Sequence, residues 1–302
     1  MITRYRTLNS WLKGIFGSTV RKISVDAGLG CPNRPGGHGP GGCIYCNQRG
    51  SGTGAFSNSQ SVTQQIERGI QVLSPRYKTT KFIAYFQSYS NTYAPLKHLE
   101  KIYTEAMDFQ QIVGLSVGTR PDCVSDEVVE LLSELNSSKL VWVELGLQSM
   151  HEKTLRIINR GHDFAIFAKT AERLMKHGIH VVTHLILGLP QESVGDMIDT
   201  ARAVSSLGVS GVKLHPLYVV KNTVLENMYN DGLYQPLTME QSITATLEVA
   251  AHINPDIVIH RLTSDPHRDE LVAPDWMLDK RTVRARLESE MERIDFWQGA
   301  KT

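Results

Sequence analysis

The chain contains little cysteine, no long apolar run and almost no net charge. Its 302 residues include 4 cysteines, 7% aromatic residues and a formal net charge of +1. No stretch approaches the roughly 18 consecutive apolar residues of a membrane span, and the first residues lack the apolar core of a signal peptide. So few cysteines exclude a disulfide scaffold and fit a reducing compartment. We therefore expect a cytoplasmic protein that makes no use of a membrane.

Three of the four cysteines, Cys31, Cys43 and Cys46, lie in one short segment with the spacing C-x11-C-x2-C. Ten of the 24 glycines of the chain fall between Gly28 and Gly54, so this segment has few side chains with which to join a core. Three buried thiols, or a disulfide with a spare thiol, therefore explain the pattern less well than a metal site. Three thiolate ligands leave one coordination position for a group that is not protein.

The spacing alone does not separate zinc from iron. Cys43 and Cys46 form a CxxC half-site that is common to both metals, and His38 in the same segment could complete a Cys3His zinc site. The choice between the two metals depends on the rest of the sequence.

Apolar runs that are bounded by turn residues alternate with amphipathic stretches, which is the βα pattern of a parallel sheet. The predicted strands are Lys22 to Ala27, Lys81 to Gln87, Ile112 to Gly118, Leu140 to Leu147, His180 to Leu187 and Ser210 to Pro216. The predicted helices are Val62 to Leu73, Leu96 to Met107, Asp126 to Leu135, Phe164 to His177 and Val194 to Leu207. Six such units form either an open doubly wound sheet or a curved partial barrel, and in both the ligands bind at the C-terminal ends of the strands.

Positive charge is concentrated around the cysteine segment. Residues 1–66 carry seven basic side chains against the single acid Asp26, so this part has a charge of +6 and the remainder −5. The interpretation without a functional role is a solvated basic face. The functional interpretation is a surface for a polyanion or for an acidic electron donor such as flavodoxin or ferredoxin.

Several motifs give the chain a family resemblance. The cysteine segment, with an aromatic residue before its last cysteine, resembles the loop of the radical S-adenosylmethionine (SAM) superfamily, although its first gap is longer than the usual C-x3-C-x2-C. The motifs ELGLQS, NRGH and HLILGLP resemble the core shared by the catalytic subunit of Elongator and the oxygen-independent coproporphyrinogen oxidases. FQSYSNTYAP, GTRPDC, KLHPLYVVKNT and HRLTSD extend the resemblance to the YhcC/YtqA-type radical SAM proteins over nearly the whole chain.

The resemblance implies an α/β fold and a cofactor chemistry. The fold would be a partial (β/α)6 TIM-like barrel over residues 1–236, with a C-terminal capping extension over residues 237–302. Cys31, Cys43 and Cys46 would hold a [4Fe–4S] cluster whose fourth iron binds SAM. An electron from the cluster would cleave SAM to a 5′-deoxyadenosyl radical, which abstracts hydrogen from the substrate.

The same resemblance implies which residues contact SAM. Gln87 and Ser88 follow the second strand, where relatives bind the methionine amine. Gln148 and Arg160 match residues near the ribose and the carboxylate, and an arginine suits bidentate binding of a carboxylate. His184 stands where related enzymes have an aspartate, so its bond to the ribose is the weakest of these assignments.

Two residues at the end of the third strand have less defined roles. Asp122 is a further candidate for the surroundings of the methionine group. Cys123 is expected to be a buried structural thiol, with a redox role as the alternative. Because Cys123 is the one cysteine outside the trio, protein ligands for a second cluster are missing, which disfavours methylthiolation.

Three functions remain open at this level. The resemblance to Elongator and the basic residues 1–66 favour an enzyme that modifies tRNA at a C5-substituted wobble uridine. The resemblance to coproporphyrinogen oxidase, together with the near-zero net charge, allows a radical SAM enzyme that acts on a small metabolite. A non-catalytic zinc protein that binds RNA is the third interpretation.

Overall fold

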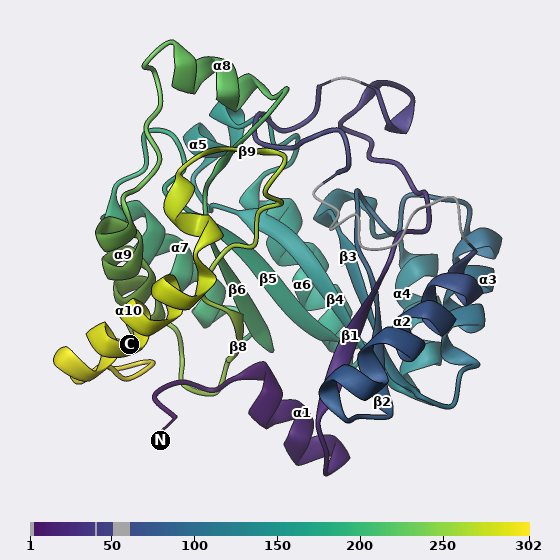
Figure 1. The fold of residues 1–302 in the computed structure, drawn as a ribbon. Coiled ribbons are helices and arrows are strands. Elements are labelled where there is room, and N and C mark those ends of the chain that lie inside the picture. Colours follow the sequence, from purple (N-terminus) through teal and green to yellow (C-terminus); the bar gives the residue numbers. More distant parts are fainter. Residues whose placement is uncertain (1–2, 40, 51–60) are drawn as a thin grey trace.

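A parallel sheet of seven strands forms the centre of the fold in the computed structural model, which describes residues 3–39, 41–50 and 61–302. The strand order is β1-β2-β3-β4-β5-β6-β8, so β1 to β6 pair in chain order and β8 pairs with β6 (Figure 1). The strands are β1 Val20–Val25, β2 Lys81–Phe86, β3 Ile112–Thr119, β4 Leu140–Gln148, β5 His180–Leu187, β6 Gly211–Pro216 and β8 Val258–Arg261.

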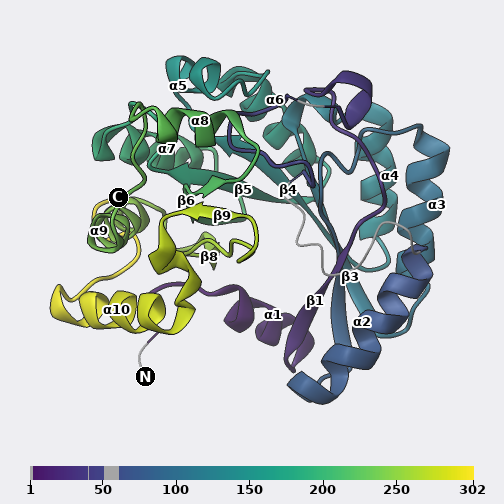
Figure 2. The same cartoon turned by 45° about the horizontal axis from the view of Figure 1, so that its top comes forward.

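The sheet curls into a partial barrel. Figure 2 shows β1 and β8 at its two edges and the large helices on its outer side. An open doubly wound sheet would carry helices on both faces, so the predicted partial barrel is confirmed. The outer helices are α2 Val62–Tyr77, α3 Leu96–Met107, α4 Asp126–Asn136, α6 Phe164–Lys176, α7 Val194–Ser206 and α9 Met239–Ala251.

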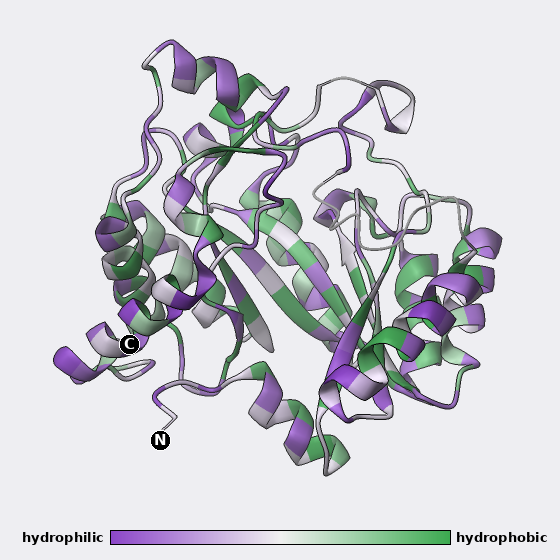
Figure 3. Ribbon diagram, in the orientation of Figure 1, coloured by the Kyte–Doolittle hydropathy of each residue, from purple (hydrophilic) through white to green (hydrophobic). Residues whose placement is uncertain are grey.

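Local sequence accounts for these elements. Ser61, Ser193 and Thr238 each begin a helix with a capping box, in which the N-cap hydroxyl and the side chain three residues later satisfy backbone N–H groups. The strands are rich in buried Val, Ile and Leu, as expected for a sheet that helices cover. Figure 3 shows hydrophobic residues along the strands and hydrophilic residues on the outer helices.

All six predicted strands are confirmed, and the structure adds elements that the pattern did not indicate. The seventh strand, β8, joins the sheet from within the predicted capping extension. The sequence pattern did not predict it, because four residues are too few for a reliable periodic signal. The remaining elements are α1 Leu8–Phe16, η1 Pro35–Gly37, η2 Pro121–Cys123, α5 Glu152–Ile157, β7 Val219–Val220, α8 Val224–Asn230, β9 Leu271–Ala273, η3 Asp275–Leu278 and α10 Lys280–Arg293. The predicted boundary at residue 237 falls between α8 and α9.

Helix α1 closes the end of the barrel at which the strands begin. Leu12 is buried against Val20 and Trp142, and the Trp11 ring meets the Trp142 ring edge to face at 6.1 Å between centroids. Before α1, Thr7 forms a parallel bridge to Ile259 of β8. The interior of the barrel is therefore accessible from the other end, where the strands finish.

The helices of the structure are all shorter or more polar than a bilayer requires. In residues 3–39, 41–50 and 61–302, none combines the length and the apolar composition of a membrane span.

The closing role of α1 predicts a large effect of a small substitution. Leu12→Ala should lower the free energy of unfolding by about 3 kcal/mol, because it opens a cavity in this floor. Lys13→Ala, at the next and exposed position, is the matched control and should change stability by less than about 1 kcal/mol. Urea denaturation of both metal-free variants measures the difference, and equal effects would contradict the role of α1 as a floor.

Candidate cofactor site at the C-terminal ends of the strands

The cysteine segment lies over the C-terminal ends of the strands, at the upper side of Figure 1. It is tied to the loops that follow two other strands. The Ser90 N–H donates to the Gly30 carbonyl at 3.1 Å, and the Ile44 N–H donates to the Ile158 carbonyl at 3.1 Å. All three cysteines of the trio therefore come from one loop at the mouth of the barrel.

Glycine is required at specific points of this loop. A side chain on Gly30 would place its Cβ 3.0 Å from the Cα of Gly37, so the two backbone segments can pass each other only without one. Gly50 has a φ of 60° and its Cβ would lie 2.5 Å from the Tyr89 ring. The high glycine content thus permits close backbone approach, as the sequence indicated.

Arg34 holds the loop from inside. It is 5% exposed, and its guanidinium donates to the carbonyls of Gly39, Cys46 and Asn47 at 3.3, 3.0 and 2.7 Å. This basic residue therefore satisfies the loop backbone and is not a surface charge.

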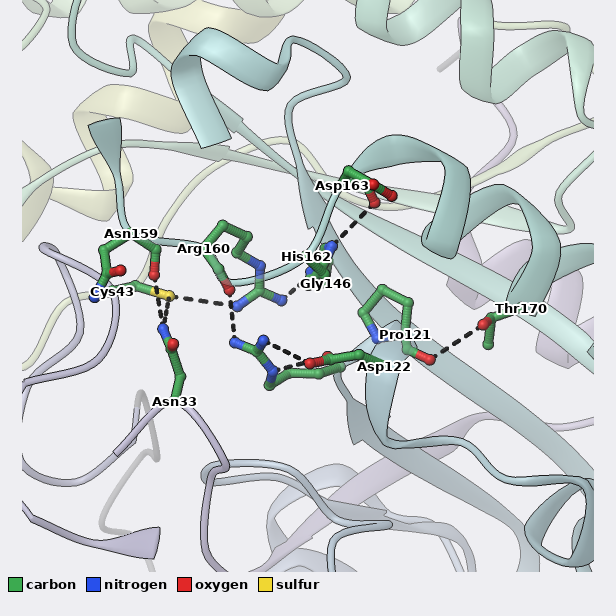
Figure 4. Close-up of polar contacts among 11 residues, drawn as sticks. Asn33, Cys43, Pro121, Asp122, Gly146, Asn159, Arg160, His162, Asp163 and Thr170 are labelled. Carbon is green, nitrogen blue, oxygen red and sulfur yellow. Dashed lines mark hydrogen bonds and ion pairs between the residues drawn. The ribbon is translucent and has the colours of Figure 1, made fainter. Parts of the chain in front are cut away.

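Cys43 is the most buried thiol of the trio and the one with the clearest partners. The Arg160 Nη1 donates to its Sγ at 3.5 Å, and the Asn33 Nδ2 does so at 3.7 Å (Figure 4). Burial alone would raise the pKa of Cys43, but the charges of Arg160 and Arg120 bring it below the ordinary value. The environment therefore favours the thiolate, which is the form that ligates a metal.

The three thiols share one loop but are not drawn together into a formed metal site. None of them is in a disulfide bond, and in the described part of the chain no three His, Cys, Asp or Glu side chains form a group that could hold an ion. His38, the alternative zinc ligand, packs its ring edge against Tyr89 at 5.0 Å. The fit to an iron–sulfur cluster thus rests on the chemistry of the donors, and the ligand role of Cys31, Cys43 and Cys46 stays a prediction.

Gln148 and Arg160, which lie twelve residues apart in sequence, come together over Gly146. A Cβ on Gly146 would lie 2.5 Å from the Arg160 Nη2 and 2.7 Å from the Gln148 Nε2. Gln148 has a φ of 81°, an uncommon conformation for a residue with a side chain. Since Arg160 also reaches Cys43, the two predicted SAM contacts and one predicted cluster ligand form a continuous site.

A second arginine fixes the position of the first. Arg120 donates from Nε and Nη2 to the two carboxylate oxygens of Asp122 at 2.9 and 2.8 Å, and from Nη1 to the Arg160 carbonyl at 2.8 Å. Asp122 is therefore engaged by Arg120, and its predicted role beside the methionine of SAM is secondary to this bond. The sequence analysis did not assign Arg120 a positioning role. Its place in GTRPDC, shortly after a predicted strand, was the available signal, and the structure shows that it is buried.

Gln87 and Ser88 follow β2 at the same end of the barrel. The Gln87 N–H donates to the Val25 carbonyl at 3.1 Å, whereas its side-chain Nε2 is buried and has no hydrogen-bond partner among the described residues. Ser88 and Tyr89 both have positive φ, of 89° and 58°. Such strain in consecutive residues is typical of functional loops, and the unpaired amide is available to donate a hydrogen bond.

His184 lies deeper in the barrel than the other predicted SAM contacts. Its Nε2 is 2.9 Å from the Glu144 Oε2, so its observed partner is a buried carboxylate. Glu144 also accepts hydrogen bonds from Ser116, at 2.9 Å, and from the Trp142 indole, at 3.0 Å. Lys22, at 2.8 Å, and Lys213 form ion pairs with the same carboxylate.

We call Lys22, Ser116, Glu144, His184 and Lys213 the buried polar layer. Its members face the barrel interior, and on β4 it lies one inward-facing position below Gly146. Sequence reasoning named His184 from this layer and missed the others. The available signal was a charged residue within a largely apolar strand, which applies to Glu144 in β4 and to Lys213 in β6.

The charges in the buried polar layer shift the titration of its members. Burial by itself would raise the pKa of Glu144, but Lys213, Lys22 and His184 hold it well below its usual range. Burial lowers the pKa of Lys213 to about 7, although Glu144 opposes this shift. Burial, followed by the charge of Lys213, lowers the pKa of His184 to about 4.

Cys123 lies in η2 and belongs neither to the cysteine loop nor to the buried polar layer. Burial, followed by the charge of Asp122, raises its pKa to about 12. The residue is therefore a thiol at neutral pH, which fits the structural role expected for it.

The basic residues of segment 1–66 do not form one surface. Lys22 is in the buried polar layer and Arg34 is inside the cysteine loop. Arg4 pairs with Asp295 at 2.6 Å and Arg49 with Glu270 at 3.2 Å. Most of the basic side chains that give residues 1–66 their charge of +6 therefore have partners within the protein.

The chain belongs to the radical SAM superfamily. The family model described as the radical SAM superfamily matches residues 29–204, and the model of the Radical_SAM C-terminal domain matches residues 209–293. The protein is therefore an enzyme whose cofactors are SAM and a [4Fe–4S] cluster. This result excludes the interpretation as a non-catalytic zinc protein.

Proteins of similar sequence extend over most of the chain. The protein YtqA of Bacillus subtilis is 38% identical over 98% of this chain and 92% of its own length, and YhcC of Escherichia coli K12 is 36% identical over 90% and 87%. A tRNA uridine(34) acetyltransferase of Dehalococcoides mccartyi is 28% identical over 51% of this chain, which corresponds to 33% of that longer protein.

The fold is also similar to a solved structure. The archaeal Elp3 of Methanocaldococcus infernus, with an N-terminal deletion, superposes with a TM-score of 0.68 at 18% identity. The match covers 92% of this chain and 64% of that one.

The buried polar layer predicts a strong effect at Glu144. Glu144→Gln should destabilise the protein by about 3–5 kcal/mol, because it leaves Lys22 and Lys213 without their counter-charge. Glu134→Gln, on the outer helix α4, is the control and should have little effect. Urea denaturation measures both, and a loss below about 1 kcal/mol for Glu144→Gln would show that the layer is solvated.

The low pKa of His184 predicts acid sensitivity. The unfolded chain binds a proton at an ordinary histidine pKa near 6.5, whereas the folded chain does so only near 4. Stability should therefore fall as the pH is lowered from 6.5 to 4, by about 1.4 kcal/mol per pH unit for this group. His184→Gln should flatten this slope, whereas the exposed His177→Gln should leave it unchanged. Parallel slopes for all three proteins would contradict the assignment.

Proposed function

We propose that the protein is a radical SAM enzyme that modifies tRNA at a C5-substituted wobble uridine. The observation that carries the proposal is the convergence of Arg160 on both the Cys43 thiol and the Gly146 backbone beside Gln148. That arrangement supplies a cofactor site at the mouth of the barrel. The choice of tRNA is supported by sequence similarity to a tRNA uridine(34) acetyltransferase, within which this chain matches a third of the length.

The roles of the residues follow from their positions. Cys31, Cys43 and Cys46 would hold the cluster, which supplies the electron that cleaves bound SAM into a carbon radical. Arg160, fixed by Arg120, presents a guanidinium fork that is suited to the carboxylate of SAM. Gln148 lies beside it and contributes an amide.

The loop after β2 would bind the other end of the methionine group. The Gln87 amide has no partner within the described residues, and Ser88 follows it in a strained backbone. The closed floor at α1 and the covered sheet exclude water from the interior, which protects a radical from side reactions.

We expect tRNA binding to depend on a few specific contacts and not on a broad basic surface. The net charge is +1 and most cations of segment 1–66 are engaged. Exposed Lys13 and Arg21 leave only scattered sites for phosphates on this segment, because Arg6 donates to the Asp256 carbonyl. Affinity should therefore depend on a limited number of phosphate contacts.

The proposed activity predicts a stimulation by substrate. Anaerobically reconstituted enzyme with SAM and a reductant should release 5′-deoxyadenosine slowly, and unmodified or partly modified tRNA that carries the correct wobble uridine should raise this rate at least tenfold. tRNA with cytidine at the same position is the control. Stimulation by a metabolite extract freed of RNA, together with none by any tRNA, would favour the small-metabolite alternative and reject the proposal.

The contact of Arg160 and Gln148 with Gly146 predicts a loss of SAM binding that leaves the iron content unchanged. Gly146→Ala would displace the Arg160 and Gln148 side chains, because the added Cβ would lie within 2.7 Å of both. We expect at least a tenfold weaker affinity for SAM, measured by equilibrium dialysis, with iron content unchanged. Gly14→Ala is the control, since its Cβ would meet nothing within 4 Å. Normal SAM affinity in Gly146→Ala would reject Gln148 and Arg160 as SAM contacts.

A further inference from the structure

A cavity of about 630 Å³ lies away from the cysteine loop. Its walls are α9, α10, the N-terminal segment before α1 and the residues that follow β8, and Figure 1 shows these elements together on one flank of the barrel. The volume is within the range of ligand-binding pockets. The motif HRLTSD, which the proposed chemistry does not use, supplies residues 261–265 of the wall.

Among the described residues of this wall, Arg261 is the one cation without a partner, and Glu292 is a carboxylate that likewise forms no ion pair with them. Arg4 pairs with Asp295 at 2.6 Å, and Arg284 pairs with Glu288 at 2.8 Å. Lys280 pairs with Asp265, and both residues line the cavity. The exposed guanidinium of Arg261 makes no hydrogen bond or ion pair with any residue that the structure describes.

The position of Arg261 also connects the cavity with the barrel. Arg261 is the register partner of Lys213, whose ammonium belongs to the buried polar layer. That layer contains two lysines against the single carboxylate of Glu144. An anion that binds Arg261 therefore meets a region with an excess of positive charge.

The remaining lining is suited to a nucleotide. Tyr5 and Trp276 offer aromatic surface, and Thr3 and Thr263 offer hydroxyl groups. Successive bases of single-stranded RNA bind on such aromatic side chains, while arginine binds the phosphates through two parallel hydrogen bonds.

We propose that this cavity is a binding site for one nucleotide of the substrate RNA, with the phosphate on Arg261. The proposal rests on the proposed function, since it takes tRNA as the substrate. It assigns the contact to the flank between α10 and the N-terminal segment, adjacent to the barrel and separate from the cofactor site. HRLTSD then serves as an RNA-binding motif.

The test is tRNA affinity as a function of salt, measured with reconstituted full-length protein and fluorescently labelled tRNA between 50 and 200 mM salt. Arg261→Ala should weaken binding about tenfold at low salt. It should also reduce the slope of log affinity against log salt by about 0.7, which is the value for one phosphate contact with a single strand. Arg261→Lys should keep the slope and bind more weakly than the wild type, because it retains the charge and loses the fork.

Arg286→Ala is the matched control. Arg286 lies on α10 and is 60% exposed, but it points to Glu240 at 3.6 Å and is not part of the cavity wall. Its removal should change neither affinity nor slope. Iron content and the thermal midpoint check that each variant is folded; if Arg261→Ala fails this check, Arg261→Lys decides the test by its affinity alone.

The outcomes separate this proposal from the proposed function. Absence of tRNA binding by the wild type would overturn both. Wild-type binding that Arg261→Ala leaves unchanged, or that Arg261→Ala and Arg286→Ala weaken equally, would overturn the cavity site and leave tRNA as the substrate. Binding of uridine 5′-monophosphate that depends on Arg261, with tRNA binding unaffected, would identify a small metabolite as the occupant and also overturn it.

Discussion

One buried carboxylate holds the curvature of the barrel on which the rest of the structure depends. Glu144 of β4 receives Lys22 from β1, His184 from β5 and Lys213 from β6, and its side chain has no exposed surface. These partners come from the edge strand β1 on one side of β4 and from β5 and β6 on the other. Since a buried charge is stable only when it is paired, the layer sets how far β1 and β6 can move apart. The sheet is thereby held as a partial barrel.

The proposed cofactor site is built on this frame, one inward-facing position above it. Gly146 follows Glu144 along β4 and carries no side chain, so Arg160 and Gln148 can lie against its backbone. Arg160 then reaches Cys43, and Arg120 fixes Arg160 from the other side. The cysteine loop is thus positioned by strand ends as well as by its own glycines. This coupling explains why functional residues that are far apart in sequence form one site.

The ion pairs and hydrogen bonds of the folded chain change the interpretation of its basic residues. A charge of +6 on residues 1–66 suggested a broad basic surface. In the folded chain Arg34 holds the cysteine loop, Lys22 balances Glu144, and Arg4 joins the two ends of the chain through Asp295. A count of charges cannot reveal this, because each ion pair joins residues that are remote in sequence. The proposed RNA contact instead falls on Arg261, in a motif near the end of the chain.

The sequence by itself determined the six βα units and the cysteine trio, because periodic apolar runs and closely spaced cysteines are local signals. The cofactor family, Gln148 and Arg160 were named through resemblance. Only the tertiary structure decided that the two residues meet over Gly146, that His184 faces Glu144, and that the extension adds the strand β8. The physical reason is that hydrogen bonds, ion pairs and steric room between distant segments depend on how the sheet curls, and no local pattern encodes that curvature.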